Sequence, residues 1–90
     1  MISFKNLINV NRSSEVPVFI QISNTMAHLI KRGTLAQGFK LPGSRSLSEN
    51  LGVHRKTVIA SYEELTSQGW IEVVPSKGTF VSSKLPVIEP

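Results

Sequence analysis

The chain contains no cysteine among its 90 residues. This absence excludes a disulfide framework and a thiolate metal site and is compatible with a reducing compartment. No apolar run approaches the roughly 20 residues that a membrane-spanning helix needs. A signal-peptide core is missing as well, because Lys5, Asn6 and Asn9 interrupt the apolar residues near the N-terminus. We therefore expect a cytoplasmic protein with no membrane segment.

Signatures of catalysis are also missing. The two histidines are isolated, and the sequence has no phosphate-binding glycine loop, no metal-ligand cluster and no nucleophile beside a base. We predict that the chain is not an enzyme, holds no metal and has no cofactor of its own. What it does carry is positive charge, with ten Lys and Arg against six Asp and Glu and a pI near 9.9. This balance fits nucleic acid as a partner, although many domains without such a partner share it.

Helical spacing of apolar residues predicts a first helix over residues 17–32. Pro17 suits a first helical position because its missing N–H is not needed there, and Gly33 supplies a stop. One face of this segment carries Val18, Phe19, Ile22, Met26, Leu29 and Ile30. Residues 1–16 are expected to form an extended N-terminal arm, in which residues 7–10 either make a short strand or pack on the core.

Two shorter helices are predicted at about residues 44–51 and 55–68. Only Val53 and His54 separate Gly52, which ends the first of them, from the start of the second. So short a turn makes two helices cross steeply, as in a helix-turn-helix. The expected core stripe of the later helix consists of Val58, Tyr62 and Leu65, with Ser61 beside them bonding back to a carbonyl.

The last helix is followed by a predicted hairpin. Residues 70–74 and 79–82 alternate like strands around the four-residue cationic tip Pro75, Ser76, Lys77 and Gly78. Residues 83–90 contain two prolines and no periodicity, which is typical of the start of a linker. The fold class predicted for residues 17–82 is thus α+β, a winged helix-turn-helix of three helices and a β-hairpin wing.

The charge order of the 55–68 helix favours DNA binding. Stability alone would place acids in the first turn and bases in the last. This helix begins with Arg55 and Lys56 and carries Glu63 and Glu64 toward its end. Since the N-terminal residues of a recognition helix meet the DNA bases, the reversed order suits docking in the major groove. A solvated face with an accidental charge order is the alternative.

The motifs together resemble the GntR-type bacterial regulators over about residues 16–81. That family has the pattern PLYxQI, GxLxPGxxLPS, RxLAxxLGVSRxTVxxAYxxLxxxG and a wing of the GxGTFV type. The matching residues here are Pro17, Val18, Phe19, Ile20, Gln21, Ile22, Leu41, Pro42, Arg45, Leu47, Leu51, Gly52, Val53, Arg55, Thr57, Val58, Tyr62, Leu65, Gly69, Gly78, Thr79, Phe80 and Val81. The resemblance implies sequence-specific binding of double-stranded DNA as the operator-reading domain of a transcription regulator.

Within that family the LPGSR run and the stretch from YEEL to GTFV look most like the MocR branch. Members of this branch join the winged helix by a long linker to an aminotransferase-like domain that binds pyridoxal phosphate. The resemblance implies that a chain ending at Pro90 is an N-terminal piece and that pyridoxal phosphate belongs to the missing C-terminal domain. Because family members dimerise chiefly through that domain, we expect a monomer in solution that pairs on a two-fold operator.

Four positions depart from the family pattern. Gln37 replaces a proline of the connector, and Ser61 replaces an alanine of the inner face. Gly43 stands where a serine normally caps the second helix, so Ser44 is expected to take that role one residue later. His54 replaces the serine before the recognition helix, where its imidazole can meet a phosphate.

Several predicted DNA contacts have alternatives that remain open. Arg45 either reaches DNA or forms an ion pair with Glu49, and the wing tip is either a minor-groove contact or a simple hairpin turn. The predicted DNA-binding residues are Arg45, His54, Arg55, Lys56, Thr57, Lys77 and Gly78. Trp70 and Tyr62 are expected in the core. The alternative function is a winged-helix module that binds protein, for which Ile59 is the one apolar hint.

Overall fold

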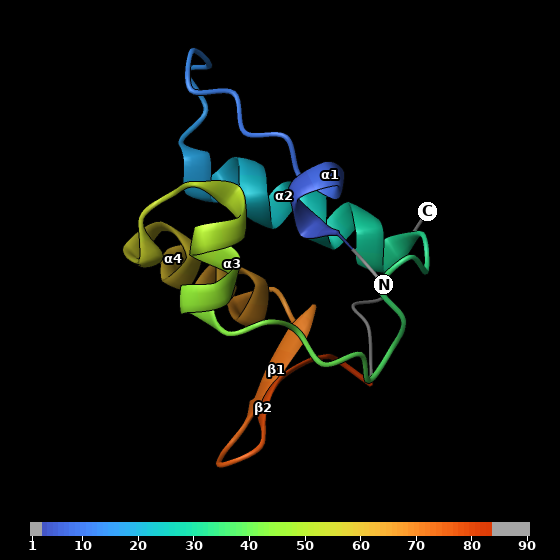
Figure 1. Ribbon diagram of the computed structural model, residues 1–90. Coiled ribbons are helices and arrows are strands. Elements are labelled where there is room, and N and C mark those ends of the chain that lie inside the picture. The colour runs from blue at the N-terminus through green and yellow to red at the C-terminus, as the bar shows by residue number, and fades with distance from the viewer. Residues whose placement is uncertain (1–2, 84–90) are drawn as a thin grey trace.

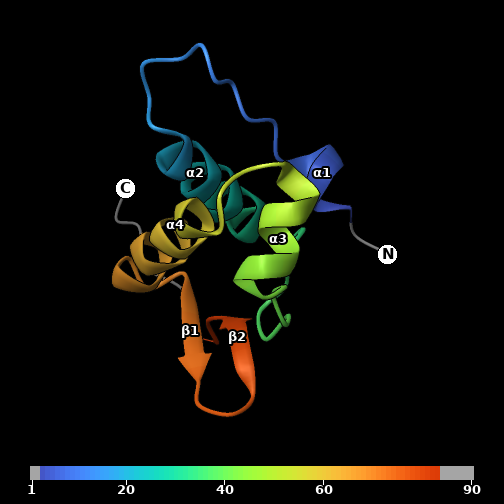
Figure 2. The same cartoon turned by 60° about the vertical axis from the view of Figure 1, so that its left-hand side comes forward.

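The computed structural model describes residues 3–83, which contain four helices and one two-stranded antiparallel sheet (Figure 1). The elements are α1 (Phe4–Leu7), α2 (Val18–Lys31), α3 (Ser44–Leu51), α4 (Arg55–Ser67), β1 (Ile71–Val74) and β2 (Gly78–Val81). Figure 2 shows α2, α3 and α4 gathered together, with the hairpin projecting from them. The three predicted helices and the hairpin follow in the predicted order. Of the predicted linker, only Ser83 lies among the described residues.

The long helix α2 is one residue shorter at each end than predicted. Pro17 has φ −54° and ψ 143°, so it is the N-cap and not the first helical residue as expected. Its carbonyl still accepts the N–H of Gln21 at 3.1 Å, which opens the helix. Most of the predicted apolar face is buried, since Ile22, Met26 and Ile30 are at most 2% exposed, whereas Val18 and Phe19 at its start are partly buried.

The N-terminal arm begins with a helical turn, so the prediction of an extended arm was wrong for its first part. α1 occupies Phe4–Leu7, and Phe4 and Ile8 are buried in the core. Of the two alternatives for residues 7–10, packing on the core is the one observed, because Leu7 and Val10 lie against the buried cluster. The one-turn helix has too few residues to be stable alone, so its packing on the core accounts for it.

Hydrogen bonds from side chains hold the remainder of the arm against the helices. The Gln21 amide oxygen accepts the N–H of Asn11 at 2.8 Å, and its amide nitrogen donates to the Val16 carbonyl at 2.8 Å. The Arg12 guanidinium donates to the Gly52 carbonyl, at the turn between α3 and α4. The arm is thus tied both to α2 and to the helix-turn-helix.

The helix-turn-helix is held by an apolar core beneath it. α3 has the predicted bounds, and Gly52 ends it in the left-handed region with φ 69°. α4 ends at Ser67, one residue earlier than predicted, with Gln68 as its C-cap. Leu47 of α3 and Leu65 of α4 are fully buried. This packing fixes how the two helices cross and leaves their polar faces outward.

The hairpin pairs Ile71 with Val81 at its base and Val74 with Gly78 at its tip. The first predicted strand is one residue too long, because Trp70 lies outside the ladder, and the second is displaced by one residue, because Gly78 lies inside the ladder and Ser82 outside it. The expected four-residue tip was therefore wrong: only residues 75–77 connect the strands. Gly78 has φ 131°, a conformation that glycine adopts more easily than other residues.

The connector between α2 and α3 pairs with β2, which the sequence did not predict. Lys40 forms a bridge with Phe80, the Leu41 N–H donates to the Thr79 carbonyl at 2.8 Å, and the Val81 N–H donates to the Phe39 carbonyl at 2.9 Å. β2 is consequently bonded on both sides. The wing is attached to the helical cluster through this connector as well as through β1.

Candidate nucleic-acid interface

The first turns of α3 and α4 bring several predicted contact residues together. Arg45 lies in the first turn of α3, while Arg55 and Lys56 open α4; all three side chains are exposed. α4 has no acidic residue in its first turn and no side-chain cap. Two cations therefore lie at the positive end of the helix dipole. This arrangement lowers the stability of the helix by itself and favours binding of an anionic partner.

Arg55 is held in place by the start of α3. Its Nε–H donates to the Ser44 hydroxyl oxygen at 2.8 Å. The cap of α3 is Gly43, with no side-chain cap bond, so the prediction that Ser44 caps this helix was wrong. The hydroxyl accepts from the arginine of the neighbouring helix through Nε, so this bond does not use the two terminal nitrogens of the Arg55 guanidinium.

The ion pair considered for Arg45 does not form. Within the described part of the chain, the Arg45 side chain makes no ion pair with Glu49. Its backbone carbonyl accepts the Ser48 hydroxyl at 2.7 Å. The guanidinium group is thus available to an external partner, and its predicted contact with DNA stays a prediction.

His54 and Thr57 define how α4 begins. His54 is the N-cap with extended backbone, and its carbonyl accepts the Thr57 N–H at 3.0 Å. The helix therefore starts regularly although a serine cap is missing. His54 is exposed, whereas Thr57 is half-buried and its carbonyl accepts the Ser61 hydroxyl at 3.0 Å. Ser61 donates to a carbonyl as predicted. Its single hydroxyl proton also has the Phe19 carbonyl of α2 within reach at 2.9 Å, so it lies between acceptors of two helices.

The wing carries two lysines, one of which sequence reasoning missed. Lys77 is exposed at the tip, where its N–H donates to the Val74 carbonyl at 3.0 Å. Lys40 reaches the same end from the connector, since a Cβ added at Gly78 would lie 3.0 Å from the Lys40 Cε. A short signal for Lys40 was present in the sequence, because Phe39, Lys40 and Leu41 alternate between apolar and charged residues as in a strand.

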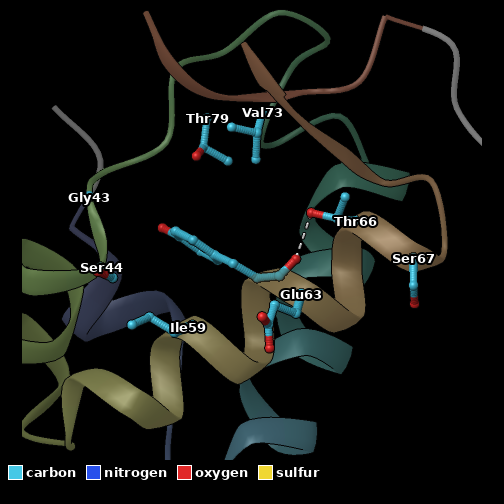
Figure 3. Close-up of a pocket in the computed structure, with 9 residues that line it drawn as sticks. Gly43, Ser44, Ile59, Glu63, Thr66, Ser67, Val73 and Thr79 are labelled. Atoms are coloured by element: carbon cyan, nitrogen blue, oxygen red, sulfur yellow. Dashed lines mark hydrogen bonds between the residues drawn. The ribbon is translucent and has the colours of Figure 1, made fainter. Parts of the chain in front are cut away.

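A hollow of about 470 Å³ separates α4 from the wing. Figure 3 shows Val73 and Thr79 pointing from the strands toward α4, and Ile59 projecting from α4. Ile59 is 40% exposed and Val73 is 62% exposed, so the hollow has apolar walls in contact with solvent. Its remaining lining residues are Gly43, Ser44, Tyr62, Glu63, Thr66 and Ser67.

The two aromatic residues assigned to the core behave differently. Trp70 is 7% exposed, and its indole N–H donates to the Gln68 amide oxygen at 3.0 Å. Tyr62 is half-buried, and its hydroxyl donates to the Pro42 carbonyl at 2.7 Å. Burial raises the pKa of Tyr62 well above its usual value of 10.0. Neither ring is laid out on an open sheet, as stacking on single-stranded nucleic acid requires.

Residues 3–83 contain neither a cluster of metal ligands nor a membrane-spanning helix. No three side chains of His, Cys, Asp or Glu gather there as a possible metal site. None of the helices in this range is long and apolar enough to cross a membrane.

Residues 21–81 match the family described as bacterial regulatory proteins, gntR family. The chain is 32% identical over 83 residues to the pyridoxine biosynthesis transcriptional regulator PdxR of Corynebacterium glutamicum, covering 92% of this chain and 18% of PdxR. It is 33% identical to the transcriptional repressor NagR of Bacillus subtilis, covering 83% of this chain and 31% of NagR. With the probable rhizopine catabolism regulatory protein MocR of Rhizobium meliloti the identity is 32%, covering 89% of this chain and 16% of MocR. The chain thus spans less than a third of these relatives.

Solved structures have the same fold. YtrA from Sulfolobus acidocaldarius, a GntR-family transcription factor, superimposes with a TM-score of 0.82 at 35% identity, over 88% of this chain and 83% of that one. AraR(DBD) in complex with operator ORX1 superimposes with a TM-score of 0.71 at 29% identity, over 82% of this chain and 92% of that one. The predicted α+β winged-helix class is confirmed.

Proposed function

The chain belongs to the GntR family of bacterial regulatory proteins, and we propose that it binds double-stranded DNA sequence-specifically as the operator-reading domain of a transcription regulator. The observation that carries this proposal is the cationic surface where α3 and α4 begin, with Arg55 tied to Ser44 and flanked by Arg45 and Lys56. The likeness to AraR(DBD), which was solved with its operator, supports it.

In the proposed complex the first turn of α4 enters the major groove. Arg55 and Lys56 point to base edges or to the adjacent phosphates, and Thr57 lies at the edge of this contact. His54 and Arg45 contact phosphates on either side of that turn. These contacts position the helix, while the residues that reach base edges supply the specificity.

The wing is proposed to meet the minor groove beside this site. Lys77 supplies a cation at the tip, and Gly78 allows the backbone to approach closely. Lys40, which lies against Gly78, adds a second positive charge to the same end of the hairpin. Residues 75–78 thus act mainly on affinity, because a contact of this kind reads groove width and charge more than sequence.

A protein-binding module remains the second candidate function. It is favoured by the solvent exposure of Ile59 and Val73, whose side chains line the hollow between α4 and the wing. If this hollow binds a protein, the neighbouring arginines are not required for that binding. The two candidates are separated by whether removing those positive charges abolishes binding.

The whole protein is proposed to belong to the MocR branch, on the strength of its LPGSR run. Relatives from more than one kind of regulator match at similar identity, so the sequence beyond residue 90 is the test. An aminotransferase-like domain with a Schiff-base lysine supports the branch, and pyridoxal phosphate would be held there. The proposed division of the chain is an N-terminal arm at residues 1–16, a DNA-binding domain at residues 17–82 and the start of a linker at residues 83–90. Because operator DNA lies in the bacterial cytoplasm, we also propose a cytoplasmic location.

The experiment that tests the proposed function is selection from a pool of random DNA duplexes. The 90-residue chain is immobilised, and bound duplexes are amplified and sequenced over several rounds. Enrichment of one motif supports operator reading. Retention of duplexes without any enriched motif contradicts sequence-specific reading, and no retention at low salt contradicts DNA binding altogether.

A further inference from the structure

Ile59 is an exposed apolar residue on the face of α4 that carries its cations. It follows Arg55 by four residues and Lys56 by three, and helical side chains at these spacings are neighbours. Its side chain is 40% exposed.

The start of α3 places Ile59 on the proposed DNA surface. Ile59 and Ser44 line the same hollow, and Ser44 is the residue that holds Arg55. Glu63, one turn further along α4, also lines this hollow, and its carboxylate is repelled by phosphates. A helix that leaves the groove near Glu63 keeps Ile59 within reach of the bases.

Base chemistry limits what Ile59 can meet in a major groove. The base edges there present hydrogen-bond donors and acceptors, and the only alkyl group among them is the C5-methyl of thymine. An isoleucine against a polar edge removes water from donors and acceptors without replacing their hydrogen bonds, which is costly. An isoleucine against a thymine methyl buries two apolar groups and loses no hydrogen bond.

We infer that Ile59 is a specificity-determining residue that contacts the C5-methyl group of one thymine in each operator half-site. This inference rests on the proposed function, because it requires α4 to lie in the major groove. Removing a single buried methyl group should weaken binding about four-fold. The contact selects thymine over cytosine, guanine and adenine at that position.

The test uses deoxyuridine, which differs from thymidine only by that methyl group. A duplex enriched by selection with the unaltered chain is synthesised with each thymine replaced in turn, and dissociation constants are measured by fluorescence anisotropy. At one thymine per half-site, deoxyuridine should weaken the unaltered chain about four-fold. With Ile59→Ala the same replacement should change affinity by less than about two-fold.

Val73→Ala is the matched control. Val73 is a second exposed β-branched residue lining the same hollow, but it lies on β1 rather than on α4. This variant should retain the full response to deoxyuridine. As a further check, selection repeated with Ile59→Gln should lose the thymine preference at that one position, and circular dichroism shows whether each variant is folded.

The outcomes separate the inference from the function on which it depends. If no motif is enriched with the unaltered chain, sequence-specific reading fails and the inference fails with it. If a motif is enriched but deoxyuridine affects the unaltered chain and Ile59→Ala equally at every thymine, the inference alone is overturned. An Ile59→Gln selection that keeps the same thymine overturns it as well.

Discussion

Ser44 and Arg55, the first residues of α3 and α4, are joined by a hydrogen bond of 2.8 Å from the Arg55 Nε–H to the Ser44 hydroxyl oxygen. The bond links the two helices of the helix-turn-helix at the surface proposed to meet DNA. Long side chains lose rotational freedom when they bind a partner. An arginine already held on one side loses less of it on binding, so Ser44 is expected to prepare Arg55 for DNA.

Replacing Ser44 with alanine should therefore weaken DNA binding without removing a charge. A typical hydrogen bond contributes about 0.5 to 1.5 kcal/mol, so the dissociation constant on a selected site should rise by roughly 2- to 12-fold. The salt dependence should not change. Ser46→Ala, at an exposed position in the same helix, is the control and should bind like the unaltered chain. Equal affinities for all three proteins would mean that the bond has no part in recognition.

The number of phosphate contacts predicts the response to salt. If Arg45, Arg55, Lys56 and Lys77 neutralise about 4 phosphates, log K should fall with log salt at a slope of about −3 to −4. Titrations between about 50 and 200 mM salt measure this slope. A flat response would count strongly against DNA as the partner and favour the protein-binding alternative.

Substitutions on α4 and on the wing should differ in pattern. Arg55→Ala or Lys56→Ala should cost roughly 1 to 3 kcal/mol on a selected site if the side chain contacts a base, and less on random DNA. Lys77→Ala should weaken binding to both DNAs about equally and make the salt slope shallower by about 1. Equal losses on both DNAs from all three substitutions would show that α4 acts only as a charged surface.

Tyr62→Phe tests how the connector is attached to α4. The substitution leaves the Pro42 carbonyl without the hydroxyl that donates to it at 2.7 Å. Losing this bond should reduce the free energy of unfolding by about 1 to 3 kcal/mol in urea titrations. An unchanged free energy of unfolding would mean that water replaces the hydroxyl at no cost.

The raised pKa of Tyr62 should make the stability of the protein depend on pH in the alkaline range. The unfolded chain ionises this tyrosine near pH 10.0, whereas burial keeps it neutral in the folded protein. The tyrosine's contribution is therefore present below that pH and is lost as the pH rises further. The unaltered chain should lose stability above it more steeply than Tyr62→Phe does, as denaturation at several pH values would reveal.

The chain is expected to be a monomer in solution. Sedimentation of the 90-residue chain without DNA should give a single species near 9.9 kDa. Two copies should assemble only on a duplex with two-fold half-sites, because DNA then supplies the spacing between them. A stable dimer in the absence of DNA would refute this prediction.

Local sequence determined the helices of the helix-turn-helix. Leu47 and Leu51 repeat at helical spacing before Gly52, and α3 has the predicted bounds 44–51. The cations at the start of α4 could be identified in the same way, because charge order along a helix depends only on the sequence. Signals of this kind depend only on residues close together in the chain, so they can be read without knowledge of the fold.

Tertiary structure decided whatever depends on residues far apart in the chain. The turn of helix from Phe4 to Leu7 exists because Phe4 and Ile8 find a core to bury in. Lys40 reaches the wing because its segment pairs with Phe80. Ser44 had two possible partners, the backbone of its own helix and Arg55, and only the crossing of α3 and α4 selected the second. In each case a weak local preference competes with a contact that only the tertiary structure makes available. For the turn of helix at Phe4, burial of apolar side chains outweighs local propensity.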